Sequence, residues 1–121
     1  MIKVCKFGGT SMSDGMNFRR VADIMNGDPD RRFLVVSAPG KRFGNDSKVT
    51  DLLYSAHDAL EAGGDFRAAF TKVRDRFSGI VREIGLAFNI DSVLDECERE
   101  IEAEKSRDFT ASRGEYQIGR A

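Results

Sequence analysis

Lys3-Val-Cys-Lys-Phe-Gly-Gly-Thr-Ser11 is the stretch on which the fold depends. An apolar strand stops at the pair Gly8-Gly9, and a helical pattern begins a few residues later. Glycines can take positive φ angles, and they lack the side chains that would keep a ligand away from the main-chain N–H groups. A helix N-terminus beyond such a turn favours anions, and Lys6 adds a positive charge beside it. The stretch is therefore a candidate phosphate site or, on the simpler interpretation, only a tight strand-to-helix turn.

The residues after this turn predict a βαβ unit. Ser13 or Asp14 can cap a helix, which the stop signals in residues 26–29 end. The apolar stripe of this helix consists of Phe18, Val21, Ile24 and Met25. The continuous apolar run 33–36 then predicts a second strand, covered on both faces and parallel to the first. Ligands of open parallel sheets bind at the carboxyl ends of the strands, where both Gly8-Gly9 and Ser37 lie.

Residues 49–105 are predicted to be helical and mostly architectural. Three apolar stripes around Leu53, Phe70 and Leu94 keep helical spacing. The single histidine, His57, has no thiol or carboxylate set at ligand spacing around it, which favours an exposed or hydrogen-bonded helix residue over a metal ligand. No metal-ligating residue is therefore predicted. The polar and basic loop 42–48 fits either a mobile loop that closes over an anionic substrate or an ordinary exposed loop.

The composition is that of one ordinary domain. A chain of 121 residues can bury roughly two-thirds of its unfolded surface. Its net charge of −1 gives no electrostatic footprint for nucleic acid or an anionic membrane, so neither is an expected partner. The absence of a long apolar run, and a strand that begins at Ile2, favour a cytoplasmic location without a signal peptide. Cys5 and Cys97 lack metal or redox spacing and are expected to be reduced thiols.

Three motifs in this sequence closely resemble those of the aspartate kinases, within the amino-acid-kinase family. The first is the string Lys6-Phe7-Gly8-Gly9-Thr10-Ser11. The second has Ser37 at a strand end, then small residues and glycine, and Thr50 at the start of a helix. The third is Ser112-Arg113-Gly114-Glu115. Considered alone, Thr50 would be a helix N-cap and Glu115 a first-turn residue that complements the helix dipole.

The resemblance implies an α/β fold, the three-layer α/β/α amino-acid-kinase fold with a mostly parallel sheet. Residues 1–121 are expected to be an N-terminal, aspartate-binding portion of such a domain, with two strands and several helices. The chain is expected to stop inside the kinase domain. The nucleotide-binding remainder and the regulatory ACT domains of the family would then lie outside this sequence.

The activity implied by the resemblance is transfer of the ATP γ-phosphoryl group to the β-carboxylate of L-aspartate, with Mg²⁺ as the companion of ATP. The product, β-aspartyl phosphate, serves lysine, threonine and methionine synthesis. Lys6 would be the catalytic residue, and it would bind the nucleotide together with Phe7, Gly8 and Gly9. L-aspartate would be held by Ser37, Thr50 and Glu115, with Glu115 on its ammonium group. A homo-oligomer is expected, because missing strands would leave an exposed sheet edge.

Two alternatives to this activity stay open. The first is that the isolated chain is a non-catalytic fragment or binding module. The second and weaker one is a sibling kinase that acts on another amino acid or on carbamate. Other nucleotide sites are excluded by their motifs. The sequence contains no GxGxxG, and Gly40-Lys41 is not a Walker A motif because Val35 stands where its first glycine is required.

Overall fold

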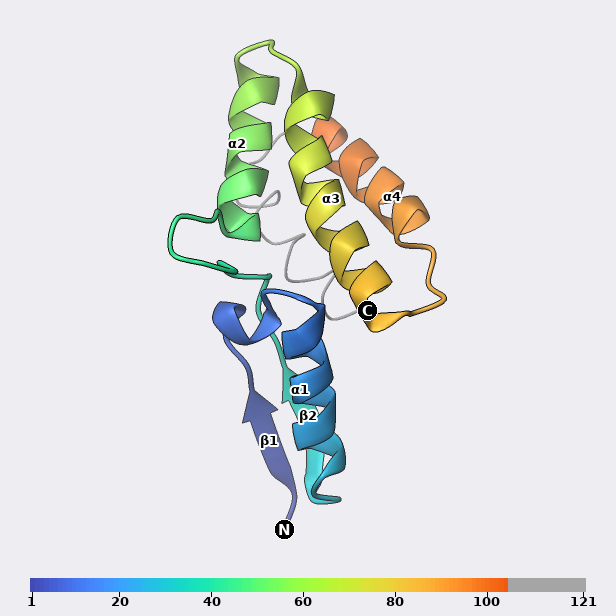
Figure 1. Ribbon diagram of the computed structural model, residues 1–121. Coiled ribbons are helices and arrows are strands. Elements are labelled where there is room, and N and C mark those ends of the chain that lie inside the picture. The colour runs from blue at the N-terminus through green and yellow to red at the C-terminus, as the bar shows by residue number, and fades with distance from the viewer. Residues whose placement is uncertain (105–121) are drawn as a thin grey trace.

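The structure is a computed structural model, and it describes residues 1–104. Its elements are β1 (Lys3–Lys6), the 3-10 turn η1 (Gly9–Met12), α1 (Gly15–Asn26), β2 (Arg31–Val35), α2 (Val49–Glu61), α3 (Phe66–Ile84) and α4 (Ile90–Glu104). In Figure 1 the strands and α1 occupy one end of this part of the chain, and α2, α3 and α4 pack side by side beyond the carboxyl ends of the strands.

The predicted βαβ unit is confirmed. β1 and β2 pair in parallel, with Cys5 opposite Leu34 and Lys6 opposite Val35, and α1 forms the crossover between them. Asp14 is the cap of α1, because its side chain accepts a hydrogen bond of 2.9 Å from the Asn17 N–H. The α/β class and the parallel strands are therefore as predicted.

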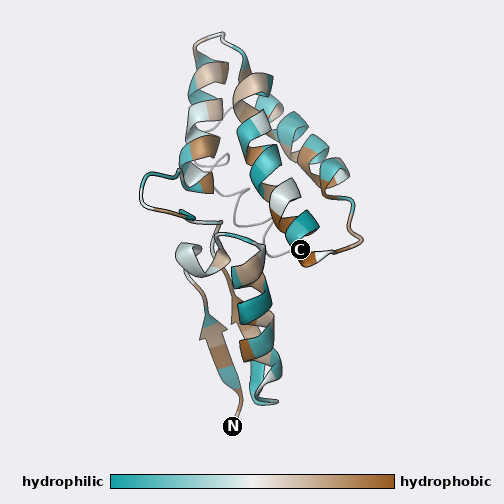
Figure 2. Cartoon of the chain, in the orientation of Figure 1, coloured by the Kyte–Doolittle hydropathy of each residue, from teal (hydrophilic) through white to brown (hydrophobic). Residues whose placement is uncertain are grey.

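The expectation that the second strand is covered on both faces is wrong within the described residues. Val4 in β1 is 65% exposed, and Phe33 in β2 is 57% exposed. The sheet has two strands in residues 1–104, and α1 packs against β2, so much of the apolar strand surface stays uncovered. Figure 2 shows hydrophobic colour on part of each strand. Ile24, which is expected in the apolar stripe of α1, is also exposed, with 44% of its surface accessible to solvent.

The core lies along α3, against which α1, α2 and α4 pack, and the buried stripes of α2, α3 and α4 are as the periodicity predicts. The largest fully buried side chains include Phe70, Leu53, Leu94 and Ile101. Two helices end at glycines in the left-handed conformation. Gly63 beyond α2 and Gly85 beyond α3 have φ angles of 71° and 67°, which glycine adopts readily. Cys97 is buried and Cys5 is partly buried, and neither forms a disulfide among residues 1–104.

His57 is more buried than the sequence indicates. Its side chain is 1% exposed on α2, so the exposed alternative is wrong, and its Nε2 lies 3.5 Å from Glu61 Oε1. The described residues contain no group of three or more histidine, cysteine or acidic residues that could hold a metal ion. No helix among residues 1–104 has the length and apolarity needed to cross a membrane.

Candidate functional site

The loops that follow β1 and β2 touch through two glycines. The Gly40 N–H donates a 2.7 Å hydrogen bond to the Gly9 carbonyl oxygen. A Cβ atom on Gly40 would lie 2.6 Å from the carbonyl carbon of Gly9, and one on Gly9 would lie 3.1 Å from the Ala38 oxygen. Only glycine therefore allows the two backbones to approach this closely.

The proposed reason for the glycine pair after β1 needs correction. Gly8 is extended, with φ −77° and ψ 177°, and within residues 1–104 the positive φ angles belong to Gly63 and Gly85. Gly8 continues the strand into the 3-10 turn, which any residue could do. What favours glycine at position 9 is the close backbone contact with the second loop, which sequence reasoning did not foresee, and the stricter requirement falls on Gly40.

A pocket of about 220 Å³ opens beside this glycine contact. Three segments form its walls: the start of η1, the loop after β2, and the first residues of α2. The residues that line it are Gly9, Thr10, Ala38, Pro39, Gly40, Lys41, Lys48 and Thr50. The carboxyl ends of the strands thus lead to a pocket, as expected for a parallel sheet.

The electrostatics of the pocket suit an anion. Lys41 and Lys48 are among its lining residues, and no lining residue in the described part of the chain is acidic. The N-terminus of α2, with its partial positive charge, lies at the pocket through Thr50. Two ammonium groups and a helix N-terminus together can bind a carboxylate or a phosphate oxygen.

Thr50 lies in this pocket but it is not the helix cap. α2 begins at Val49, its N-cap is Lys48, and no side chain caps it. The Val49 N–H donates to the Pro39 carbonyl oxygen at 2.9 Å, so the loop after β2 satisfies the first amide of the helix. The expectation of Thr50 as the N-cap is therefore wrong by two positions.

The other predicted site residues have different placements. Lys6 is the exposed last residue of β1, and Ser37 is partly buried two residues beyond β2, so both belong to the same sheet edge. Phe7 is partly buried against the core, and its N–H donates to the Val35 oxygen at 2.9 Å. None of these three, nor Gly8, lines the pocket.

The structure thus brings Gly9 and Thr50 together in one pocket, with Lys6 and Ser37 at the neighbouring strand ends. Glu115 lies outside the described residues.

The loop 42–48 is tied by an ion pair. The Arg42 guanidinium donates to both Asp46 oxygens, at 2.7 and 3.0 Å, and the Arg42 N–H donates to Oδ2 at 3.0 Å. These hydrogen bonds from Arg42 hold the pKa of the Asp46 carboxyl well below its usual range. The ion pair gives the loop internal structure, while all of its residues except Asp46 are exposed. Closure of the loop over a substrate stays a prediction.

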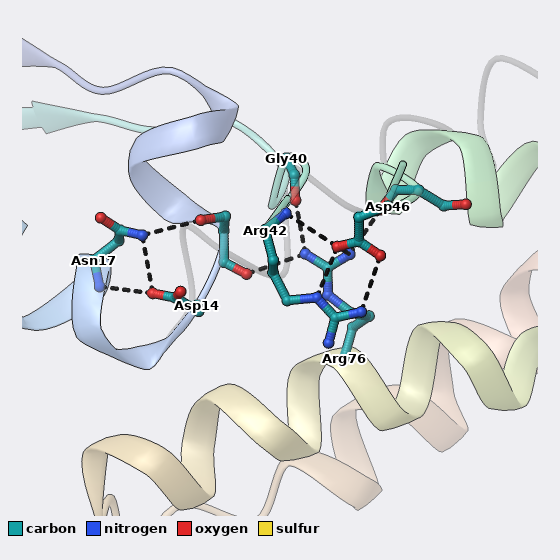
Figure 3. A network of polar contacts seen from close by, with 8 residues as sticks. Asp14, Asn17, Gly40, Arg42, Asp46 and Arg76 are labelled. Atoms are coloured by element: carbon teal, nitrogen blue, oxygen red, sulfur yellow. Dashed lines mark hydrogen bonds and ion pairs between the residues drawn. The ribbon is translucent and has the colours of Figure 1, made fainter. Parts of the chain in front are cut away.

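Sequence reasoning missed one residue of this region, Arg76 on α3. Its side chain is 5% exposed, and its guanidinium donates to the carbonyl oxygens of Gly40 and Ser47, each at 2.7 Å (Figure 3). A signal existed, because Arg76 lies three residues after Val73 and four before Ile80, on the border of the apolar stripe of α3. Arginine at such a position is commonly a solvated edge residue.

Comparison with known proteins agrees with the motifs. No protein-family model matches this chain. The chain is 37% identical over 106 residues to aspartokinase 3 of Bacillus subtilis, covering 87% of this chain and 23% of that protein. The structure superposes on Clostridium acetobutylicum aspartate kinase with a TM-score of 0.91 at 39% identity, covering 96% of this chain and 27% of that one.

A second solved structure, E. coli aspartokinase III in complex with aspartate and ADP, matches with a TM-score of 0.73 at 27% identity. It too covers 96% of this chain and 26% of the other. The chain therefore spans about a quarter of the length of the relatives it matches. By its motifs, its sequence identity and its α/β fold, the chain belongs to the aspartate kinase family.

Proposed function

We propose that this chain forms the aspartate-binding part of an aspartate kinase, which transfers the γ-phosphoryl group of ATP to the β-carboxylate of L-aspartate. The observation that carries the proposal is the pocket that joins Gly9, Thr50 and two lysines at the carboxyl ends of parallel strands. A dicarboxylic amino acid suits this pocket, because its walls supply cations, a hydroxyl and helix amides but no competing carboxylate. The whole enzyme would supply the rest of the site.

Each predicted residue has a role in this proposal. Thr50 and Ser37 orient aspartate, and Glu115 binds its ammonium group. Lys6, at the exposed end of β1, reaches toward the phosphoryl group, and the amides around Gly8 and Gly9 bind phosphate oxygens with Phe7 beside them. Lys41 and Lys48 join the set as the charges that attract a carboxylate into the pocket.

The chemistry needs no general base, because the β-carboxylate of aspartate is already ionised at neutral pH. Catalysis then rests on positioning the two substrates and stabilising negative charge. Mg²⁺ belongs to the proposal only as the companion of ATP. The described residues offer no acidic cluster that would hold it, so none of the roles above depends on it.

The proposal extends to the biological setting. β-Aspartyl phosphate would serve lysine, threonine and methionine synthesis. A homo-oligomer belongs to the proposal as well. For the isolated 121-residue chain, the uncovered apolar surface of β1 and β2 supports self-association, since an unpaired strand edge can pair with another chain.

A substrate panel tests the reaction. ADP release is measured for the full-length protein with aspartate, glutamate and carbamate offered separately. Aspartate alone should support turnover, and equal or faster turnover with carbamate or another amino acid would indicate a sibling kinase. Lys6→Ala should lower turnover by about 10²- to 10³-fold, the usual loss for one preorganised charge. Unchanged turnover would make Lys6 merely structural.

Binding experiments test the pocket itself. In the full-length enzyme, Thr50→Val and Glu115→Gln should each weaken aspartate binding and spare ATP binding. Thr71→Val is the matched control, because Thr71 is an exposed residue of α3 whose hydroxyl donates to the Arg67 carbonyl one turn earlier and lies outside the lining of the pocket. If Thr50→Val and Thr71→Val bind aspartate equally well, Thr50 is not a substrate contact.

The competence of the 121-residue chain is a separate matter, because the chain spans only about a quarter of its relatives. Calorimetric titration of the chain with aspartate and with ATP measures what it retains. Aspartate binding without turnover would favour the binding-module interpretation for the isolated chain.

A further inference from the structure

Arg76 is a buried cation whose side-chain hydrogen bonds and ion pair, within residues 1–104, go to loops near the pocket. From the side of α3 its Nη2 donates to the carbonyl oxygens of Gly40 at 2.7 Å and Ser13 at 3.0 Å. Its Nη1 donates to the Ser47 carbonyl oxygen at 2.7 Å and lies 3.5 Å from Asp46 Oδ2. We infer that Arg76 is a positioning residue. By donating hydrogen bonds to three backbone carbonyl oxygens, it fixes the positions of the three wall segments of the pocket relative to one another.

Each wall of the pocket has one anchor on this guanidinium. The wall that begins with Gly9 and Thr10 continues through η1 to Ser13, whose carbonyl oxygen accepts one bond. The wall from the second loop is anchored at Gly40 itself. The third wall begins at Lys48, directly after the Ser47 carbonyl oxygen that accepts the remaining bond. Figure 3 shows these loops converging on the guanidinium from different directions.

The chemistry of this junction calls for arginine. Three backbone carbonyls from segments far apart in the sequence point at one place, and a planar guanidinium can donate to all of them at once. Asp46, which also binds Arg42, supplies the nearby negative charge that a buried cation requires. Without Arg76 these carbonyls would be left near each other with no donor, and the loops would separate.

Arg76 also lines a second cavity. It has a volume of about 320 Å³ and is lined in part by Arg42, Asp46, Lys72 and Arg76. Arg76 lines this cavity directly and reaches the pocket at Gly9 through its bond to the Gly40 carbonyl oxygen. Loss of its side chain would enlarge this cavity beside Asp46 and Ser47, which is a further reason to expect the loop before α2 to move.

The same helix offers a matched control in Arg74. Its guanidinium binds Asp91 and Asp95 at the other side of α3, at 3.4 and 2.9 Å, and so joins α3 to α4. Arg74→Gln removes an arginine of the same helix and a comparable ionic network, but one that touches no wall of the pocket. The Arg74→Gln variant therefore shows the effect of losing an arginine and its ion pairs at a place away from the pocket.

The test follows individual amides by hydrogen exchange and NMR in the 121-residue chain. The reporters are the Gly40 N–H, bonded to Gly9, and the Val49 N–H, bonded to Pro39. In Arg76→Gln both should exchange about 10- to 100-fold faster, relative to the buried amides of Leu94 and Cys97 in α4, since charged hydrogen bonds are lost locally. Arg76→Lys keeps the charge without the planar fork and should give an intermediate acceleration. Arg74→Gln should spare both reporters and loosen α4 instead.

The inference is overturned if Arg76→Gln and Arg74→Gln speed all amides by a common factor, because Arg76 would then act only on global stability. If Arg76→Gln does not fold, Arg76→Lys decides: exchange at Gly40 and Val49 equal to wild type would overturn the positioning role. The consequence for substrate rests on the proposed function. In the full-length enzyme, aspartate should bind at least about tenfold more weakly to Arg76→Lys than to Arg74→Lys. A wild-type protein that does not bind aspartate would refute the proposed function while the amide result still stands.

Discussion

Gly40→Ala is the sharpest test of the contact that forms the pocket. The added Cβ would lie 2.6 Å from the Gly9 carbonyl carbon, 2.8 Å from its oxygen and 2.9 Å from the Thr10 nitrogen. Ordinary contact distances are about 3.5–4.0 Å, so the two loops must separate by about 1 Å. All three atoms belong to the backbone, and therefore no side-chain rotation can relieve the clash.

The change in the free energy of unfolding of Gly40→Ala combines two losses and one gain. Overpacking costs about 1–3 kcal/mol, and the lost Gly40–Gly9 hydrogen bond costs about 1 kcal/mol. Replacing glycine by alanine also restricts the unfolded chain, which returns about 0.4–1 kcal/mol. The free energy of unfolding should therefore fall by about 1–3.5 kcal/mol, a substantial share of the about 5–15 kcal/mol typical of a domain.

Urea unfolding, followed by circular dichroism, measures this loss in the 121-residue chain. Gly8→Ala is the matched control, since a Cβ there meets nothing within 4 Å and its φ of −77° suits alanine. The control should be neutral or slightly stabilising. Gly9→Ala, with its nearest contact at 3.1 Å, should fall between the two. If Gly40→Ala is as stable as Gly8→Ala, the close approach of the two loops is not a feature of the protein.

Two other changes test the packing and the charge around the site. Gly15→Ala places a Cβ 2.4 Å from the Cβ of Glu83, so thermal unfolding should show the contact between α1 and α3 weakened by about 1–3 kcal/mol. Gly79→Ala has open space and should instead stabilise α3 by up to about 1 kcal/mol; equal effects would refute the contact. The lowered pKa of Asp46 means that its ionised form stabilises the fold above about pH 4 and that this contribution is lost as the pH falls further. Asp46→Asn should therefore be less stable than wild type at pH 7 and approach it at low pH, and a constant difference across pH in urea titrations would contradict this.

Several features were predictable because they are local or follow from connectivity. The apolar spacing of α1, α2, α3 and α4 marks their buried faces, and a strand, a helix and a strand in close succession require a parallel pair. The cap at Asp14 follows from side-chain chemistry within one turn, and the stop at Gly63 follows from the backbone freedom of glycine. The motifs around Gly9 and Thr50 likewise point to the edge of the sheet where the pocket lies.

The tertiary structure alone decided which distant backbones touch. The contact of Gly9 with Gly40, the capping of α2 by the Pro39 carbonyl, and the three carbonyls on Arg76 each join segments from different elements. Periodicity carries no information about such contacts, because it records which face of an element is apolar and not which loop will lie against it. The exposure of Val4 and Phe33 has the same origin, since a strand's own residues cannot reveal how many neighbours cover it. The sequence by itself determined the elements and their order, whereas the packing of loops around one buried guanidinium determined the shape of the pocket.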